Sequence, residues 1–463
     1  MREDAPDAHP YIPNSAPMAK AQMLEAIGVD DVEDLYASIP AALRLNAPLD
    51  IPPALSSEVE LRRHMTGLLD QNVPVSRALS FLGAGCYHHH VPSVCGEINS
   101  RAEFLTAYAG EPYEDHGKWQ AIFEYTSLMA ELVEMDVVNV PNYDGYQAAA
   151  TSLRMALRMT GRSRVLVTEA MLADKRRKVD SYLAGVAETE SVPLDRSTGR
   201  TDLAAVREML DDSTAAIYIE TPNAIGVIET EIAEIASLAH ERGALLICGV
   251  EPLALGFIAS PARYGADILC GDIQSLGLGM HFGGAHGGFI ATHDEEAFVY
   301  EFPSRLFGLA PTSVDGELGF TDVAYERTSL AMREDGIEWV GTAAALWGIT
   351  AGVYLSLLGP QGLREIGDYV AATTRYAIER LRAVDGVEVV AADAAHWREF
   401  GVRFTGRDAA DILADLRGRG IFGGVPLTRE FPELGQVVLV AVTEMHTAAD
   451  IDRLALALQE VLR

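Results

Sequence analysis

Short apolar runs alternate with amphipathic helical segments between about residues 78 and 345. The segments at 117–136, 143–161 and 231–243 carry apolar residues at the helical spacing. Strands that alternate with helices indicate a mostly parallel sheet with helices on both faces, whose ligands bind beyond the carboxyl ends of the strands. The apolar runs that predict the strands are 163–170, 215–223, 243–252, 266–272 and 287–293.

The segments on either side of this region follow other patterns. Residues 21–77 are short helical pieces separated by prolines, which is typical of a segment that wraps another domain or a partner subunit. Residues 346–463 predict a connector helix and a small C-terminal α+β domain. Residues 1–20 are acidic and punctuated by proline, and predict a disordered tail in which Met1 or Met18 is the start.

One uncharged stretch, 339–363, is long enough to cross a membrane. It also contains several glycine, threonine and serine residues and ends at Gly359-Pro360. This composition favours a buried helix that stops at the Gly-Pro pair, so we expect no membrane span.

Charge narrows the class of partner. The 463 residues include 36 Lys plus Arg against 67 Asp plus Glu, a net charge of −31, which argues against nucleic acid and anionic membranes as partners. Few of the basic residues are lysine, as in proteins of salt-rich cytoplasm or of GC-rich genomes, and we expect subunit assembly to depend on salt. Four cysteines without C-x-x-C, and the lack of an apolar leader, fit a cytoplasmic location.

A large parallel-sheet domain followed by a small α+β domain is the layout of fold-type I pyridoxal-phosphate (PLP) enzymes. Such enzymes need a lysine at a strand end to hold the aldehyde as a Schiff base. After the strand at 266–272 this chain has Gln274 and Ser275, neither of which forms an imine. Where an acid for the pyridine nitrogen is expected stand Cys248 and Gly249, with Glu251 out of register.

A family resemblance extends over most of residues 20–463 and rests on the motifs FLGAGCYHHHVPSV (81–94), AEFLTAY (102–108), QAIFEY (120–125), MDVVNVPNYDG (135–145), TPNAIGVIE (221–229), EPLALG (251–256), YGADILCGDIQSLGLGMHFGG (264–284) and VTEMHTAADIDRL (442–454). With these motifs the chain resembles the α subunit (subunit 1) of the two-subunit glycine dehydrogenase (decarboxylating), in the P-protein family of the glycine cleavage system. The combination of QSLG with FGG after YGAD is specific, because catalytic relatives carry the lysine there.

The resemblance implies that this chain holds no cofactor and that PLP and its lysine belong to a partner β subunit in an α₂β₂ assembly. The family reaction decarboxylates glycine and transfers its aminomethyl group to the lipoylated H-protein. A contribution of this chain to the partner's active site is expected from Tyr87, His88, His89 and Tyr143. Structural packing is the alternative for these residues, and consecutive histidines point to opposite faces of an extended segment, which argues against a metal site.

The chain departs from the family pattern at 114–120 and 333–343. These departures leave open a divergent, non-catalytic paralogue that serves another PLP-dependent partner or amine substrate. A further alternative is an independent PLP enzyme that uses Lys175 or Lys178, which follow the strand at 163–170. Asp144 opens a helix, where we expect it to cap the helix rather than leave the amides free for phosphate. The glycines between 277 and 288 fit either a phosphate nest or a tight turn.

Overall fold

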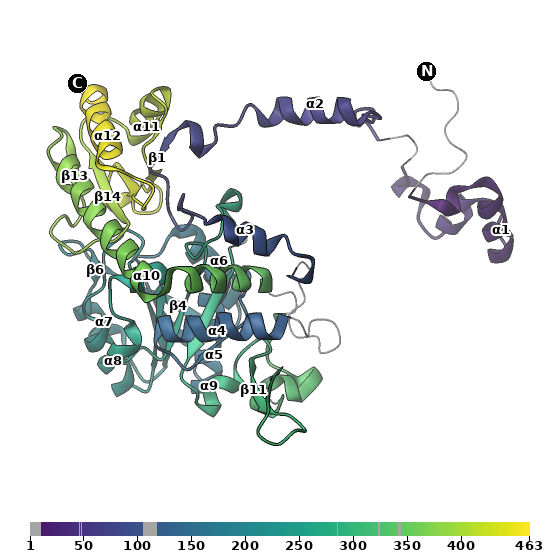
Figure 1. Ribbon diagram of the computed structural model, residues 1–463, viewed down its shortest axis with the longest axis horizontal. Coiled ribbons are helices and arrows are strands. Elements are labelled where there is room, and N and C mark those ends of the chain that lie inside the picture. The colour runs from purple at the N-terminus through teal and green to yellow at the C-terminus, as the bar shows by residue number, and fades with distance from the viewer. Residues whose placement is uncertain are drawn as a thin grey trace. The chain divides into compact units, whose positions relative to one another are not determined.

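The computed structural model describes residues 11–45, 47, 49–104, 118–284, 286–322, 325–340 and 344–463 (Figure 1). Two parts of the departures from the family pattern, 114–117 and 341–343, lie outside the described residues. The chain divides into two compact units, Met1–Asn72 and Val73–Arg463, so the boundary falls just before the expected one at residue 77.

The first unit is helical, as its proline-separated pattern predicts. Helix α1 (Pro17–Ile27) begins inside the expected disordered tail, because Pro17 supplies a fixed φ at the first helical position. Two 3₁₀ turns, Val32–Tyr36 and Ala41–Leu43, precede helix α2 (Glu58–Leu69). None of the described side chains between residues 11 and 72 is buried, so the apolar residues of this unit are exposed or only partly covered.

The second unit contains the expected large sheet. Its seven strands lie in the order β2-β10-β9-β8-β7-β3-β4, and β9, β8, β7, β3 and β4 are parallel neighbours, while β10 is antiparallel to β9 and β2. The strands are β2 (Val137–Val138), β3 (Arg164–Thr168), β4 (Glu188–Val192), β7 (Thr214–Thr221), β8 (Leu245–Val250), β9 (Ile268–Asp272) and β10 (Gly288–Thr292).

Helices bury both faces of this sheet, because successive side chains of a strand point to opposite faces. Cys248 and Leu269 join the core formed with α4, α8 and α10, whereas their neighbours Ile247 and Cys270 join the core formed with α5, α6 and α9. The helices are α3 (Ser93–Asn99), α4 (Trp119–Val133), α5 (Gly145–Thr160), α6 (Ala173–Leu183), α7 (Leu203–Met209), α8 (Ile232–Glu241), α9 (Glu296–Tyr300) and α10 (Ala345–Arg382). The doubly covered sheet confirms the α/β, fold-type I architecture.

Helix α10 contains most of the uncharged stretch and runs alongside α4 (Figure 1). A Cβ added to Gly348 or Gly352 would lie 3.1 or 3.4 Å from Tyr125 of α4, so small residues permit this close packing. The expectation that the helix stops at Gly359-Pro360 is wrong. Gly359 has φ 59° and ψ −176°, which breaks the helix locally, and the chain then continues as helix to Arg382. Across the described residues, no helix has the length and apolar character needed to cross a bilayer.

The C-terminal part forms the expected small α+β layer. Its antiparallel sheet has the order β13-β14-β17-β16, and its core joins the second half of α10 with α11 and α12. Phe81 enters this core, and β1 pairs in parallel with β15, so the chain near residue 80 belongs to this layer. The remaining elements are β1 (Leu79–Ser80), β5 (Leu194–Asp195), β6 (Arg200–Thr201), β11 (Phe307–Pro311), β12 (Leu318–Asp322), β13 (Val387–Val389), β14 (Glu399–Phe404), α11 (Ala409–Gly418), β15 (Ile421–Phe422), β16 (Val425–Pro426), β17 (Val437–Ala441) and α12 (Ala448–Val461).

Candidate functional site

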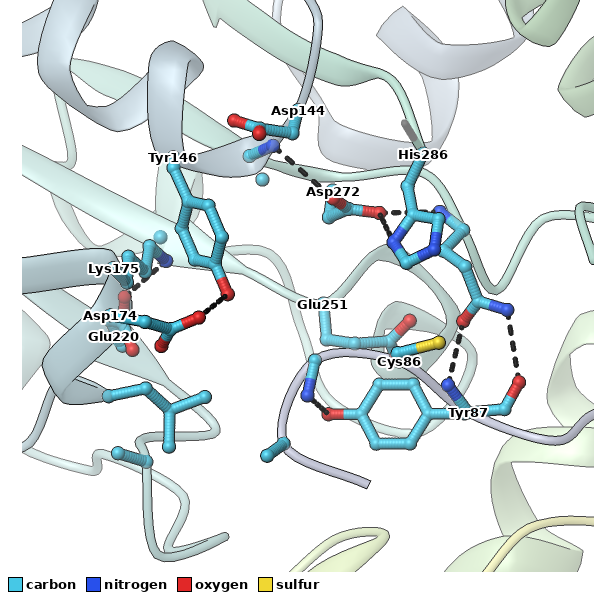
Figure 2. A pocket seen from close by; sticks show the side chains of 18 of the residues that line it. Cys86, Tyr87, Asp144, Tyr146, Asp174, Lys175, Glu220, Glu251, Asp272 and His286 are labelled. Carbon is cyan, nitrogen blue, oxygen red and sulfur yellow. Dashed lines mark hydrogen bonds and ion pairs between the residues drawn. The ribbon is translucent and has the colours of Figure 1, made fainter. Parts of the chain in front are cut away.

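A cavity of about 200 Å³, lined in part by charged side chains, lies beyond the carboxyl ends of β7, β8 and β9, where an open α/β sheet binds its ligands (Figure 2). Glu220, Glu251 and Asp272 enter it from the ends of these three strands. The start of α5, the lysines of α6 and the segment 84–87 complete the wall. The cavity is therefore the counterpart of the ligand site that the sequence predicts.

At the expected position of the Schiff-base lysine, Gln274 is 2% exposed and fully engaged with the backbone. Its Oε1 accepts from the Tyr87 N–H at 3.1 Å, and its Nε2 donates to the carbonyls of Tyr87 at 3.0 Å and Leu278 at 3.2 Å. The Ser275 hydroxyl donates to Glu251. Neither residue offers an amine, as the sequence predicts.

No acid occupies the end of β8. Cys248 is buried in the core, and a Cβ on Gly249 would lie 2.3 Å from the Tyr218 hydroxyl, so the structure has no room for a longer side chain there. Glu251, one residue past β8, lines the cavity but accepts from the N–H groups of Leu253 at 3.4 Å and Ala254 at 3.1 Å. It acts as the cap of the following 3₁₀ turn.

The helix start that would hold a phosphate is already occupied by carboxylates of this chain (Figure 2). Asp144 accepts from the Gln147 N–H at 2.8 Å, which confirms its capping role. Asp272 accepts from the N–H groups of Gly145 at 3.3 Å and Gln274 at 2.8 Å. Burial raises the pKa of Asp272 to about 7, although both N–H groups oppose that rise. Because these amides are engaged and flanked by two acids, a phosphate has no favourable place there.

The residues present therefore do not fit PLP. The cavity has no imine-forming side chain where one is expected, no acid in register for the pyridine nitrogen, and carboxylates at the phosphate position.

Lys175 and Lys178 line the same cavity, nearer than their place in the sequence suggested. Lys175 forms an ion pair with Glu220, and although burial lowers the pKa of its ammonium, the Glu220 carboxylate outweighs that effect and the pKa is raised. Lys178 lies 3.6 Å from Asp144 and 4.2 Å above the Tyr146 ring. Imine formation needs a neutral amine, so the pairing of Lys175 disfavours it as a PLP anchor.

The four residues expected near the partner's active site lie in different environments. Tyr87 and His89 are buried, with 8% and 5% of their surface exposed, and His89 Nε2 donates to the Leu278 carbonyl at 2.7 Å. His88 is half-buried, and Tyr143 is 50% exposed. The structure thus brings Tyr87 to the cavity wall, while His88 and Tyr143 keep side-chain surface that a partner can reach.

Sequence reasoning missed two charged residues next to the cavity. Glu399 lines it and accepts from the Tyr87 hydroxyl at 2.9 Å, and burial raises its pKa. Arg398 is 1% exposed, lies 4.4 Å above the Tyr87 ring and has an N–O distance of 3.7 Å to Glu251. Asp272 was missed as well, although its position at the end of a predicted strand could have identified it as a site residue. No local sequence pattern identifies Arg398 or Glu399 as site residues. Within the described ranges, no group of three or more His, Cys, Asp or Glu side chains is placed to hold a metal ion.

Comparison with known proteins places these features in a family. The model of the family described as glycine cleavage system P-protein matches residues 9–458. A relative from Staphylothermus marinus, named probable glycine dehydrogenase (decarboxylating) subunit 1, is 37% identical over 98% of this chain and 99% of its own length. One of the same name from Carboxydothermus hydrogenoformans is 36% identical over 96% of this chain and 98% of its own.

Solved structures agree. An inhibitor-bound glycine decarboxylase (P-protein) of the glycine cleavage system superposes with a TM-score of 0.84 at 34% identity, covering 99% of this chain and 100% of that one. A sphingosine-1-phosphate lyase from Burkholderia pseudomallei, at 15% identity with a TM-score of 0.63 over 92% of this chain and 94% of its own, shares the fold. The chain therefore belongs to the glycine cleavage system P-protein family, among the relatives named as subunit 1.

Proposed function

We propose that this chain is the subunit of a two-subunit glycine dehydrogenase (decarboxylating) that does not anchor the cofactor. A lysine-bearing β subunit holds PLP, and the pair assembles as α₂β₂. The complex decarboxylates glycine and passes the aminomethyl group to the lipoyl arm of the H-protein. PLP, when bound to the partner, supplies the electron sink for loss of CO₂.

The single observation that carries this proposal is the set of side chains at the former cofactor position. In a chain that matches subunit 1 relatives over nearly its full length, Gln274 stands at the lysine position, and Asp144 and Asp272 fill the phosphate position. A chain that retains the fold but not the cofactor contacts needs a partner to perform PLP chemistry.

This chain contributes side chains to the surroundings of the partner's active site and stabilises the partner by packing on it. The accessible residues His88 and Tyr143 are the candidates to reach the partner's active site. The exposed apolar residues of the N-terminal unit are the candidates to pack on the partner. The first role follows from surface that the unit Val73–Arg463 leaves uncovered, and the second from apolar surface that the N-terminal unit does not cover itself. Neither role requires a ligand in the cavity of this chain.

Glycine–bicarbonate exchange tests the proposal. We expect no exchange with either chain alone and exchange when this chain is mixed with the β-type subunit and H-protein. Absorbance in the imine band should belong to the β subunit, and this chain alone should show none after addition of PLP. A stable coloured complex that fails to exchange glycine would reject glycine as substrate, and an imine band in the lone chain would reject the assignment of PLP to the partner.

A further inference from the structure

The segment 84–90 is held in place by side chains from both layers of the second unit. From the large layer, Gln274 binds the backbone of Tyr87, and the Leu278 carbonyl accepts from His89. From the small layer, Glu399 accepts from the Ala84 N–H at 2.6 Å, Glu444 accepts from the His90 N–H at 2.7 Å, and the Thr443 hydroxyl donates to the His88 carbonyl at 2.8 Å. The segment therefore has a single conformation as long as these contacts persist.

Gln274 binds the segment both as a hydrogen-bond acceptor and as a hydrogen-bond donor. Its carboxamide accepts from one N–H and donates to two carbonyls, and Gln274 is 2% exposed. A lysine can only donate, and an ionised carboxylate can only accept, so neither side chain reproduces this set. The residue at the lysine position is thus matched to a structural task.

The segment that Gln274 holds also carries accessible side chains. His88 is half-buried and His90 is exposed, while Tyr87 and His89, on either side of His88, are buried. Because successive side chains of an extended segment point to opposite sides, fixing the backbone of Tyr87 also fixes the direction in which the side chains of the adjacent residues point.

We infer that Gln274 is a positioning residue for the reaction of the complex: its carboxamide holds the backbone of Tyr87, so that segment 84–90 presents His88 and His90 to the partner in one conformation. The inference rests on the proposed function. Gln274 itself touches neither substrate nor cofactor, and it acts through the segment that it binds.

Substitution of Gln274 by Glu separates this role from general stability. In Gln274→Glu, the oxygen that replaces Nε2 faces the carbonyls of Tyr87 and Leu278, so an ionised side chain repels both and only a protonated one can donate. We expect kcat of the mixed enzyme, relative to wild type at the same pH, to fall about tenfold at pH 8 and to recover toward pH 6. Gln274→Met, of similar size but without hydrogen bonds, should stay low at both pH values.

Hydrogen exchange at the Tyr87 amide gives a readout that does not depend on activity. In the full-length lone chain at pH 8, we expect this amide to exchange about tenfold faster in both variants than in wild type. Gln436→Glu is the matched control, because the Gln436 side chain accepts from the Ala409 N–H at 3.0 Å and a carboxylate can accept equally well. This control should match wild type in both measurements.

The outcomes separate the inference from the proposed function. Wild-type protection of the Tyr87 amide in Gln274→Met would overturn the inference, as would a Gln274→Met enzyme with the kcat of wild type. Failure of wild-type chains to catalyse exchange when mixed would instead reject the proposed function. In that case amide exchange would still decide whether Gln274 holds the segment.

Discussion

Asp272 ends β9 with two backbone N–H groups directed at its carboxylate, yet burial raises its pKa to about 7. In the unfolded chain an aspartate titrates near pH ~4. Between these values the native chain retains a proton that the unfolded chain has released, so Asp272 lowers stability progressively as the pH rises through this window. Above about pH 7 the penalty is complete.

Asp272→Asn should remove that charge penalty but lose one hydrogen bond, because the N–H groups of Gly145 and Gln274 donate to different oxygens of the carboxylate and a carboxamide has one acceptor oxygen. We expect the free energy of unfolding of the variant, relative to wild type, to be about 1 kcal/mol more favourable at pH 8 than at pH 4. The estimate is well below the full effect of the shift because the side chain keeps 31% of its surface exposed. Urea denaturation at the two pH values measures the difference.

At the surface, an Asp→Asn substitution is expected to change stability at pH 8 in the opposite direction. Hydrogen bonds from Ser213 lower the pKa of Asp211 to about 2, so Asp211→Asn should reduce stability at pH 8. An Asp272→Asn variant that gained no stability relative to wild type between pH 4 and pH 8 would show that the Asp272 charge carries no penalty in the native chain.

Whether a site residue can be predicted from the sequence depends on whether it lies next to a recognisable element of the chain. Gln274 is identifiable because it follows a recognisable strand at the place where a lysine is expected. Glu399 is not, because its contact with Tyr87 joins residues 312 positions apart. The burial of Tyr87 and His89 was equally hidden, since alternation in an extended segment predicts that neighbours diverge but not which of them faces inward.

At the scale of elements, short apolar runs and helical periodicity identify the parallel strands β3, β7, β8 and β9 and the helices α4, α5 and α8. They miss the parallel strand β4, because its residues Glu188–Val192 are mostly polar. Periodicity gives less guidance for α6, whose exposed face is rich in charge. Helix α10 shows another limit. A Gly-Pro pair predicts an end, but packing of Val370 and Leu381 on the far side of the break keeps the chain helical.

Gly359→Ala tests the break in α10. At φ 59° and ψ −176° a side chain is strained, although nothing lies within 4 Å of the added Cβ, so the cost comes from the backbone alone. We expect a loss of about 1–3 kcal/mol in the free energy of unfolding. Thermal and urea unfolding of the full chain measure it.

Gly418→Ala in α11 is the matched control. Its added Cβ also meets nothing within 4 Å, and its φ lies outside the left-handed region, so alanine should stabilise the chain by about 0.5–1 kcal/mol. If Gly359→Ala were also neutral or stabilising, the two halves of α10 could join without a break, and the kink would have no backbone cause.

At the scale of the whole molecule, the two units differ in what they bury. The unit Val73–Arg463 has its own cores around both sheets. The unit Met1–Asn72 leaves large apolar side chains of α2 exposed, including Leu61 at 47%, Leu68 at 48% and Leu69 at 59%. The wrapping role expected from the sequence supplies a cover for such side chains, and we assign that cover to the β subunit.

Deletion of residues 1–72 should therefore weaken assembly while leaving the rest folded. Burial of a leucine contributes about 1.5–3 kcal/mol. Loss of several such contacts should therefore raise the Kd for the β subunit by about 100-fold or more. Binding is best measured in high salt, where the charge of −31 is screened and apolar contacts dominate. The thermal unfolding temperature of residues 73–463 should stay close to that of the full chain.

Point variants distinguish apolar contact from mere chain length. Leu61→Ala combined with Leu68→Ala should weaken binding, whereas Glu60→Ala combined with Arg63→Ala, on the same helix, should leave it nearly unchanged in high salt, because screened surface charges contribute little. If the truncated chain bound the β subunit as tightly as the full chain, the apolar side chains of α2 would need another cover. Sedimentation of the lone chain would then show whether a second copy of this chain provides it.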